Sequence, residues 1–210
     1  MIGRPQVGVL AVQGAFVEHE QALHEVGADT AQVRTPEQLD GLDGLVIPGG
    51  ESTTFGLVAE RSGLLPALRE AVGSGLPVFG TCAGMIMLAR ATTTGSQPLV
   101  GGMDIVVRRN AFGRQVASFE ADIPVAGLGE PAVPAVFIRA PWIEDAGEGI
   151  DVLATCLGRA VAARQGDLLV TAFHPELTDD RRIHALFVDM VRARRDNVGR
   201  EEGAVRVRAQ

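Results

Sequence analysis

A cysteine occupies a position in this sequence where a nucleophile could be built. Cys82 follows the apolar run LPVFGT (76–81) and precedes AGMIMLARA (83–91), so a predicted buried strand meets a predicted helix there. Gly80 and Gly84 relieve the crowding of such a sharp turn, which projects a side chain above the sheet edge. The positive potential of a helix N-terminus favours a thiolate. Small buried cysteines are also common in protein cores, so the local sequence leaves both interpretations open.

His174 and Glu176 form a second group with possible chemistry. They follow the predicted strand LLVTAF, and in an extended backbone residues i and i+2 face the same side, so the carboxylate can lie beside the imidazole. Pro175 between them restricts His174 to extended conformations. A carboxylate on one imidazole nitrogen fixes the tautomer and leaves the other nitrogen free to accept a proton from sulfur. Without a nearby nucleophile, the same residues would fit an ordinary loop at a strand end.

The other three histidines are expected to have no such role. His19 and His24 fall in a predicted first helix, where we expect both on the solvated side, and His184 falls in a predicted last helix.

A thiolate that attacks a carbonyl group also needs hydrogen-bond donors for the oxyanion. The backbone N–H of Ala83, directly after the cysteine, is one candidate. Gly49 and Gly50 follow another predicted strand and could supply the second donor, because parallel strands deliver their C-terminal loops to one edge of a sheet. The same stretch, GGESTTFG, could form a phosphate loop, but it lacks the Gly-Lys-Ser/Thr ending of such loops.

The composition excludes several classes of function. The 19 basic residues are all arginine, so no side chain can form a Schiff base and no phosphate-loop lysine exists. A net charge of -7 argues against nucleic acid or an anionic membrane as a partner. No Cys/His cluster has the spacing of metal ligands, and we expect neither a metal nor another cofactor.

Cysteine usage and the N-terminal segment indicate the compartment. Cys82 and Cys156 are too few for a disulfide framework, and we expect Cys156 to be core packing. The first fourteen residues contain no long apolar segment with a cleavage site, and no apolar run reaches the length that spans a membrane. We therefore expect a cytoplasmic protein.

Strand and helix patterns alternate in the first part of the chain. Apolar runs predict strands at 6–12, 30–33, 44–48 and 76–81, and helical spacing predicts helices at 16–26, in the stretch up to 72, and over 83–91. From 98 to 170, strand-like segments such as MDIVV, VASFEADIPV and AVFIRAP are separated by Gly/Pro turns. The pattern predicts a three-layer α/β fold with a mostly parallel sheet, helices on both faces and antiparallel additions at the sheet edge.

The C-terminal part closes the predicted domain. Residues 181–194 form an amphipathic helical pattern, and residues 198–210 have no core-forming pattern. We predict a single domain over 1–197 and a disordered tail over 198–210.

Six sequence blocks, in the expected order, resemble the class I, or triad, glutamine amidotransferases, and most closely the glutaminase subunits of pyridoxal 5'-phosphate synthases. A single HPE or GGES would be weak support, whereas six ordered blocks are specific. The blocks are AVQGAF (11–16), PGGEST (48–53), GTCAGMIMLA (80–89), RNAFGRQ (109–115), FIRAP (137–141) and AFHPEL (172–177).

The resemblance implies a flavodoxin-like fold and a Cys-His-Glu triad. Cys82 would be the nucleophile, His174 the base and Glu176 the acid that orients it. L-glutamine would be hydrolysed to L-glutamate and ammonia through a cysteine thioester. The ammonia would pass to a separate synthase subunit, a (βα)8 barrel in this family, which builds pyridoxal 5'-phosphate. The absence of lysine agrees with this division, since imine chemistry would then occur on the partner.

The resemblance also implies a set of residues that bind substrate or partner. The backbone of Gly50, Glu51 and Ser52 would hold glutamine and supply part of the oxyanion hole. Arg109 would bind the α-carboxylate of glutamine, and Ile138 and Arg139 would line the same pocket. Gln13 would lie at the border of the site, where the family meets its synthase partner. A guanidinium fork suits a free carboxylate, although Arg109 alone would also fit a solvated loop. For Arg139, an interior ion pair is an alternative.

Three other functions remain open. Another triad amidotransferase subunit, such as the one that serves histidine biosynthesis, would share the triad but should lack RNAFGRQ and FIRAP. A cysteine peptidase or other thiol hydrolase would not need a carboxylate clamp at Arg109. A non-catalytic regulatory subunit that only docks would not need Cys82, His174 and Glu176 to be intact.

Overall fold

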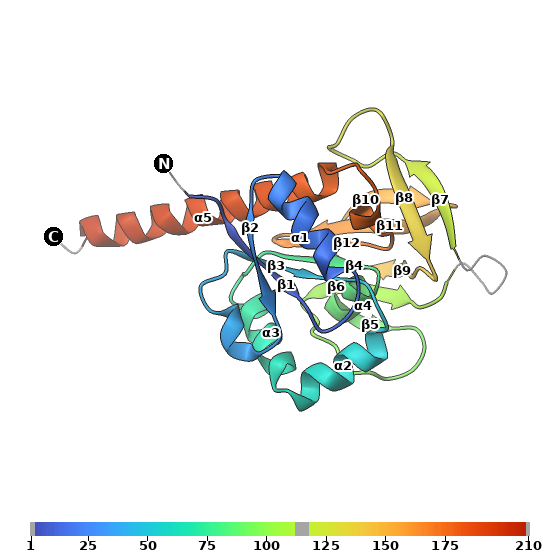
Figure 1. Ribbon diagram of the computed structural model, residues 1–210, viewed down its shortest axis with the longest axis horizontal. Coiled ribbons are helices and arrows are strands. Elements are labelled where there is room, and N and C mark those ends of the chain that lie inside the picture. Colours follow the sequence, from blue (N-terminus) through green and yellow to red (C-terminus); the bar gives the residue numbers. More distant parts are fainter. Residues whose placement is uncertain (1–2, 112–117, 209–210) are drawn as a thin grey trace.

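A ten-stranded mixed sheet forms the centre of the molecule (Figure 1), and five of its nine strand pairings are parallel. The computed structural model describes residues 3–111 and 118–208, so residues 112–115 of the block RNAFGRQ and 116–117 of the segment VASFEADIPV lie outside the described residues. Five parallel strands have the spatial order β2, β1, β3, β4, β12. Their bounds are Gln6–Leu10 (β1), Asp29–Val33 (β2), Gly44–Ile47 (β3), Val78–Thr81 (β4) and Leu168–Thr171 (β12). This is the strand order of a flavodoxin-like fold, so the predicted mostly parallel α/β sheet is confirmed.

The register of three neighbouring strands brings their C-terminal ends level. β4 pairs with β12 so that Thr81 faces Thr171, and with β3 so that Gly80 faces Ile47. All three strands are buried along their whole length, as expected for parallel strands covered by helices on both faces. The loops after β3, β4 and β12 therefore begin at one edge of the sheet, where ligand sites of such folds form.

Antiparallel pairings extend the main sheet beyond β12. β11 lies beside β12, β9 beside β11 and β6 beside β9, while β5 pairs in parallel with β6 and β10 pairs with β11. Their bounds are Ala89–Thr92 (β5), Met103–Arg108 (β6), Trp142–Ala146 (β9), Asp151–Cys156 (β10) and Arg159–Gln165 (β11). The predicted antiparallel additions are therefore present on this side of the sheet.

Two strands that were predicted as part of the main sheet form a separate two-stranded sheet, which we call the ribbon. Its strands are Ser118–Ile123 (β7) and Val133–Ile138 (β8). Phe119 stacks on Phe137 with ring centroids 4.5 Å apart, and Phe137 meets Phe173 edge-on at 5.7 Å. The backbone N–H of His174 donates to the carbonyl of Val136 at 2.9 Å. These contacts attach the ribbon to the segment that follows β12.

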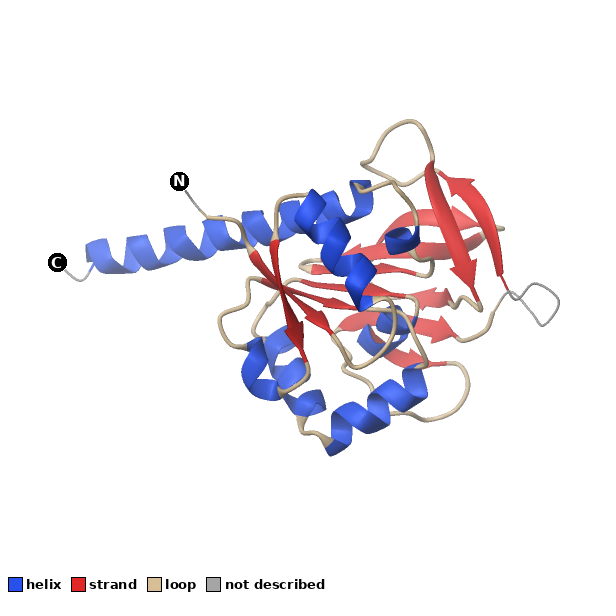
Figure 2. Cartoon of the chain, in the orientation of Figure 1, coloured by secondary structure: helices blue, strands red, loops and turns tan. Residues whose placement is uncertain are grey.

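Helices cover both faces of the parallel half, with α1 and α5 on one face and α2, α3 and α4 on the other (Figures 1 and 2). Their bounds are Phe16–Glu25 (α1), Ser52–Arg61 (α2), Leu64–Gly73 (α3), Ala83–Leu88 (α4) and Arg182–Arg208 (α5), with 3₁₀ turns at Pro36–Leu39 and Pro175–Leu177. Alternate residues of β4 face the two layers. Phe79 packs against Phe187 of α5, with ring centroids 5.7 Å apart, whereas Gly80 abuts Gly84 of α4. The three predicted layers are therefore present.

Two helices differ in length from the sequence prediction. The segment AGMIMLARA was predicted as one helix, but α4 ends at Leu88 because Ala89 has an extended backbone and starts β5, which pairs with β6. α5 continues to Arg208, through most of the predicted disordered tail. No proline interrupts 198–208, and its Glu, Ala and Arg residues favour helix locally. The division into a domain over 1–197 and a tail over 198–210 stays a prediction.

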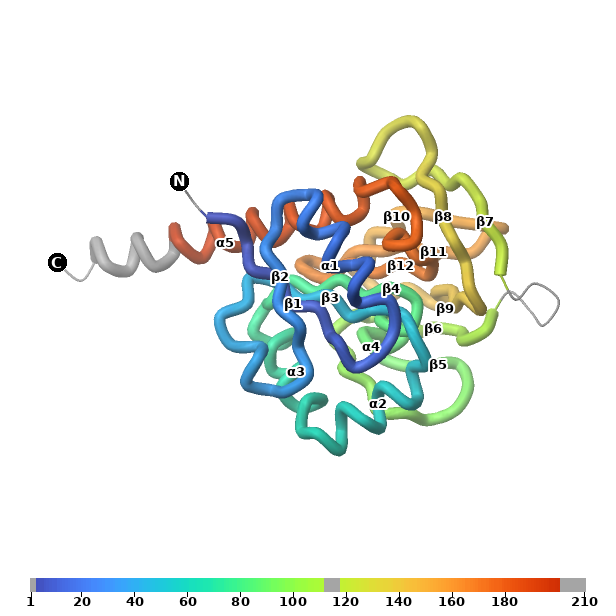
Figure 3. The backbone as a smooth tube through the Cα atoms, in the orientation of Figure 1, coloured from blue at the N-terminus to red at the C-terminus, as the bar shows by residue number. Residues whose placement is uncertain are grey.

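The N-terminal segment and α5 lie side by side (Figure 3). Arg195 of α5 donates to the carbonyl of Gly3 at 3.1 Å and pairs with Asp43 at 3.2 Å. As far as Arg195, α5 is therefore attached to the segment before β1 and to the residue before β3.

Candidate active site

Cys82 occupies a strained turn between β4 and α4. Its backbone has φ +50° and ψ −100°, a region that costs a residue with a side chain roughly 1–3 kcal/mol. The turn also depends on two glycines. A Cβ at Gly80 would lie 2.6 Å from the Gly84 carbonyl carbon, and one at Gly84 would lie 2.0 Å from the Ile47 carbonyl oxygen. The cysteine is held by its N–H, which donates to the carbonyl of Thr171 at 2.7 Å.

His174 and Glu176 are directly hydrogen-bonded behind the cysteine. His174 Nδ1 lies 2.7 Å from Glu176 Oε1, and the Glu176 side chain is fully buried. The two side chains meet as the sequence predicted, but by a different local geometry. His174 is followed by the 3₁₀ turn Pro175–Leu177, so the carboxylate reaches the ring through a turn and not along an extended strand.

The electrostatics of the group favour a charged imidazole. Burial would lower the pKa of His174, but hydrogen bonds to Cys82 and Glu176, together with their charges, raise it to about 10. Burial would raise the pKa of Glu176, but His19 and His174 outweigh it and the pKa is lowered. The imidazolium of His174 is therefore favoured between the carboxylate of Glu176 and the sulfur of Cys82, the nucleophile.

A cavity of about 310 Å³ opens on the sulfur and the imidazole. Its volume lies at the lower end of the range for small-molecule sites, about 300–1,000 Å³, and suits a ligand of amino-acid size. It is lined by Gly14, Ala15, Gly49, Gly50, Glu51, Ser52, Cys82, Ile86, Arg109, Asn110, Ile138, Arg139, Pro141, His174 and Leu177. The structure thus brings nine of the predicted site residues, Gly49 among them, to one cavity. Arg139 is exposed, so the interior ion pair considered for it is wrong.

The loop after β3 lies against the reacting groups without space for side chains. A Cβ at Gly49 would lie 2.4 Å from His174 Cε1 and 3.4 Å from Cys82 Cβ. Gly50 has φ +148°, and a Cβ there would lie 2.7 Å from Gln13 Nε2. Only glycine combines this conformation with this contact. The backbone of the loop can therefore approach a substrate closely.

Arg109 is fixed at the cavity by two side chains. Its Nη2 donates to Glu51 Oε1 at 3.0 Å and its Nη1 to Gln97 Oε1 at 2.9 Å. Gln97 also accepts from Ser52 Oγ at 3.2 Å. Sequence reasoning missed Gln97, because it lies in an irregular segment with no pattern that indicates a site. The guanidinium is thus oriented by the protein and is not the arginine of a solvated loop.

The carboxylate of Glu51 has a role that sequence reasoning also missed. It caps α2 by accepting from the N–H groups of Thr53 and Thr54, at 3.1 and 2.7 Å. Partial burial would raise the pKa of Glu51, but the hydrogen bonds from Thr54 and Thr53 lower it to about 2. Its carbonyl accepts from Gln13 Nε2 at 2.9 Å, so Gln13 lies at the border of the cavity.

Ala83 and Glu176 are site residues that do not line the cavity. Ala83 is the first residue of α4, and the N–H groups of a first helical turn have no partner within the helix. That N–H is next to the sulfur in the chain and remains our candidate oxyanion donor. Glu176 lies behind His174.

The prediction for His19 was wrong. Its side chain is fully buried, and its Nε2 lies 3.4 Å from Glu176 Oε2. The signal was present in the sequence, because His19 precedes Ala22 and Leu23 by three and four residues and so shares their apolar helix face. His24 is exposed, as predicted.

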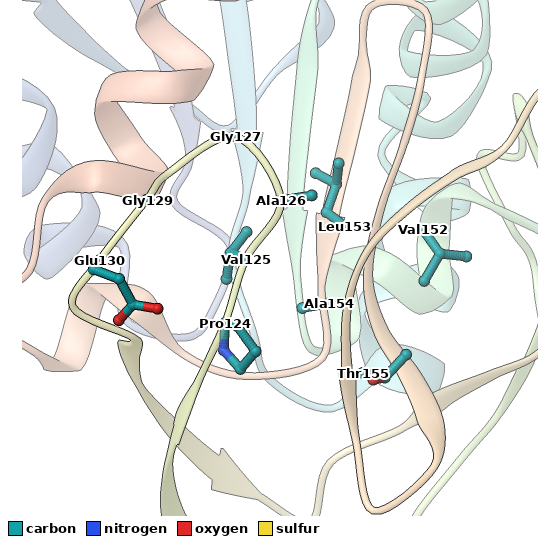
Figure 4. A pocket seen from close by; sticks show the side chains of 10 residues that line it. All are labelled: Pro124, Val125, Ala126, Gly127, Gly129, Glu130, Val152, Leu153, Ala154 and Thr155. Atoms are coloured by element: carbon teal, nitrogen blue, oxygen red, sulfur yellow. The ribbon is translucent and has the colours of Figure 1, made fainter.

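A second, larger hollow lacks the chemistry of the first. It has a volume of about 530 Å³ and lies between the loop after β7 and strand β10 (Figure 4). Glu130 is the only ionisable side chain among its lining residues, which include no cysteine or histidine. In the described part of the chain, no group of three His, Cys, Asp or Glu residues could hold a metal ion. None of the helices described combines the length and apolarity that crossing a membrane requires.

Comparisons with known proteins give similarity over nearly the whole chain. The SNO glutamine amidotransferase family matches residues 9–193. The chain is 60% identical over 191 residues to "Pyridoxal 5'-phosphate synthase subunit PdxT" of Parafrankia sp. (strain EAN1pec), covering 90% of this chain and 94% of that protein. For the protein of the same name from Mycobacterium leprae (strain TN), the identity is 58% over 192 residues, covering 89% and 96%. A solved structure described as "Crystal structure of glutamine amidotransferase" has 48% identity and a TM-score of 0.84, covering 88% of this chain and 98% of that one.

Proposed function

Because the chain belongs to the SNO glutamine amidotransferase family, we propose that it is the glutaminase subunit of a pyridoxal 5'-phosphate synthase. It hydrolyses L-glutamine to L-glutamate and ammonia. The observation that carries the mechanism is the array of Cys82, His174 and Glu176 at a cavity that also holds an oriented arginine, Arg109.

The first half of the reaction forms a thioester. The Cys82 thiolate attacks the side-chain carboxamide carbon of glutamine, and the oxyanion accepts hydrogen bonds from the N–H groups of Ala83 and Gly50. His174, charged at neutral pH because its pKa is raised to about 10, donates its proton to the departing nitrogen. Ammonia leaves as the C–N bond breaks, and the glutamyl group stays on the sulfur.

The second half returns the enzyme to its starting state. Neutral His174 accepts a proton from water, and the resulting hydroxide attacks the thioester carbon. The C–S bond breaks, glutamate leaves, and the thiolate and imidazolium are restored. Glu176 keeps one tautomer of His174 throughout, because its Oε1 accepts from Nδ1. Arg109 binds the α-carboxylate of glutamine, with Ile138 and Arg139 along the same wall.

Free ammonia is protonated in water near neutral pH, so its delivery to a second active site must be direct. The acceptor in our proposal is a synthase subunit of the (βα)8-barrel type in a hetero-oligomer, located in the cytoplasm. Gln13, at the border of the cavity, is the candidate contact with that subunit. The absence of lysine supports this division, because the imine chemistry of sugar phosphates then belongs to the partner.

The other functions considered for the sequence fit the site less well. A peptidase has no use for a guanidinium held at the cavity by Glu51 and Gln97. A subunit that only docks has no use for a strained cysteine beside a histidine and carboxylate pair.

The test is ammonia release from L-glutamine by the purified chain, with and without a pyridoxal 5'-phosphate synthase subunit. We expect release that requires the partner and is lost in Cys82→Ala. Cys156→Ala is the matched control, since this buried thiol lies in β10 and does not line the cavity. Equal release without the partner would indicate an autonomous glutaminase. No release from a folded and docked chain would overturn the catalytic assignment.

A further inference from the structure

We propose that His19 is a positioning residue that holds the Glu176 carboxylate in the orientation that His174 needs. The inference rests on the glutaminase mechanism proposed above. It concerns a residue on α1, far in sequence from the triad, that does not line the substrate cavity.

The two oxygens of Glu176 have different surroundings. Oε1 lies 2.7 Å from His174 Nδ1. Oε2 is buried and makes no hydrogen bond of regular geometry with any residue described. The closest opposite group is His19 Nε2 at 3.4 Å, and both side chains are fully buried. This contact is longer than a regular hydrogen bond, but a buried carboxylate oxygen with one donor nearby depends on that donor.

The charge on Glu176 fixes the direction of the hydrogen bonds. The pKa of Glu176 is lowered, so the group is a carboxylate that only accepts. Burial keeps the pKa of both His19 and His184 lowered, so both rings are neutral. His19 Nε2 must then carry its proton, because a lone pair there would face the carboxylate. His19 Nδ1 accepts from His184 Nε2, 3.0 Å away.

This direction explains the remaining contacts of the cluster. Thr81 Oγ1 lies 3.2 Å from His19 Nε2 and shares the same proton as a second acceptor. His184 Nδ1, which has no hydrogen-bond partner among the residues described, is an acceptor in this tautomer and not a stranded donor. The side chains of His184 on α5 and His19 on α1 therefore form one chain of donors that ends at the catalytic carboxylate, with Thr81 of β4 as a second acceptor.

The cluster is rigidly packed. His19 meets Phe79 edge-on at 6.1 Å, and Phe79 meets His184 edge-on at 5.8 Å. Charged groups that act on it are Glu18 on α1, Arg181 ahead of α5 and His174 beside Glu176. A purely structural polar cluster would affect stability alone, whereas a positioning role affects the rate and its pH dependence.

The experiment measures glutamine-dependent ammonia release by complexes of the synthase subunit with wild type, His19→Leu, His19→Gln and the exposed control His24→Gln. A hydrogen bond to a charged group is worth enough to change a rate about 10- to 100-fold. We expect kcat of His19→Leu to fall by at least tenfold, with KM for glutamine changed less than about twofold. The acid limb of kcat/KM should move to higher pH, because Glu176 loses a donor and protonates more easily. His24→Gln should match wild type.

Two polar variants keep the test decisive if His19→Leu does not fold. Glutamine places an amide N–H near the position of Nε2, whereas asparagine reaches only that of Nδ1. The proposal expects His19→Gln to recover most of kcat and His19→Asn to stay about tenfold below it. Equal kcat values and acid limbs in both variants and wild type would overturn the inference while leaving the triad intact. Absence of Cys82-dependent release in wild type would overturn the proposed mechanism and this inference with it.

Discussion

Glu176→Gln separates the charge of the orienting acid from its shape. Glutamine has nearly the volume of glutamate, so the fully buried site keeps its packing. The pKa of His174 rises from 6.5 to about 10, which at about 1.4 kcal/mol per pKa unit corresponds to about 5 kcal/mol in favour of the imidazolium. Glu176 and Cys82 together produce this preference for the imidazolium, which outweighs the opposing effect of burial. Removing one should cost about 2–3 kcal/mol, a factor of roughly 30–160 in kcat.

The amide can add a second penalty through His19. If Nε2–H of His19 faces the Oε2 position, the amide oxygen of the variant turns toward it and the NH2 group turns toward His174. His174 would then carry its proton on the wrong nitrogen, a fault that costs a triad up to about 10⁴-fold. We therefore expect a loss of at least 30-fold.

The assay is ammonia release at saturating glutamine across a pH series, in complex with the synthase subunit. Besides the lower kcat, the basic limb should move to lower pH, because His174 loses an anionic partner and gives up its proton sooner. Glu60→Gln, at an exposed position of α2, is the matched control. A kcat within threefold of wild type and an unmoved basic limb would refute the role given to Glu176.

Three further perturbations test other parts of the site. Arg109→Lys keeps the charge but loses the fork of two donors, so KM for glutamine should rise about 10- to 100-fold, with exposed Arg108→Lys unchanged in steady-state kinetics. Gly50→Ala forces a side chain into φ +148°, so release should fall at least tenfold in the same assay, and normal release would contradict the tight loop. Burial keeps the pKa of His184 in the folded chain well below 6.5. As pH falls below 6.5, the histidine is therefore protonated in the unfolded chain but not in the folded one. The free energy of unfolding should decrease there by up to ~1.4 kcal/mol per pH unit. Urea unfolding of His184→Met should show a shallower decrease.

Local patterns were sufficient to predict four strands of the parallel half of the sheet and the reacting group. The fifth, β12, falls at the end of the region assigned to antiparallel additions, but it pairs in parallel with β4. Short apolar runs that are bounded by Gly or Pro are typical of strands buried between helices, and the ends of β4 and β12 carry Cys82 and the segment of His174. Because parallel strands end at one edge, the sequence also predicted that Gly50 would lie near them.

Partners distant in the sequence were not predictable in the same way. His19 bonds to a residue 165 positions away, and Arg109 depends on Gln97 in an irregular loop. The ribbon was assigned to the main sheet because strand patterns indicate extended backbone and not the neighbour with which it pairs. The extent of α5 was missed because the sequence of 198–208 has no amphipathic pattern and was taken for a tail.

The ribbon strand β8 and the residue after it contribute to the site in two ways: the main chain supports the reacting residues, and side chains line the cavity. Carbonyl groups of β8 touch both reacting residues: that of Val136 accepts from the His174 N–H at 2.9 Å, and that of Ile138 lies 4.0 Å from Cys82 Sγ. The side chains of Ile138 and Arg139 meanwhile form part of the cavity wall. Because main-chain atoms make the supporting contacts, we expect mutations of these two side chains to change the cavity wall while the nucleophile and base stay in place. We therefore expect variants of this chain with altered substrate choice to map to the end of β8 and Arg139, and variants that lose the chemistry to map to the loops of the parallel sheet.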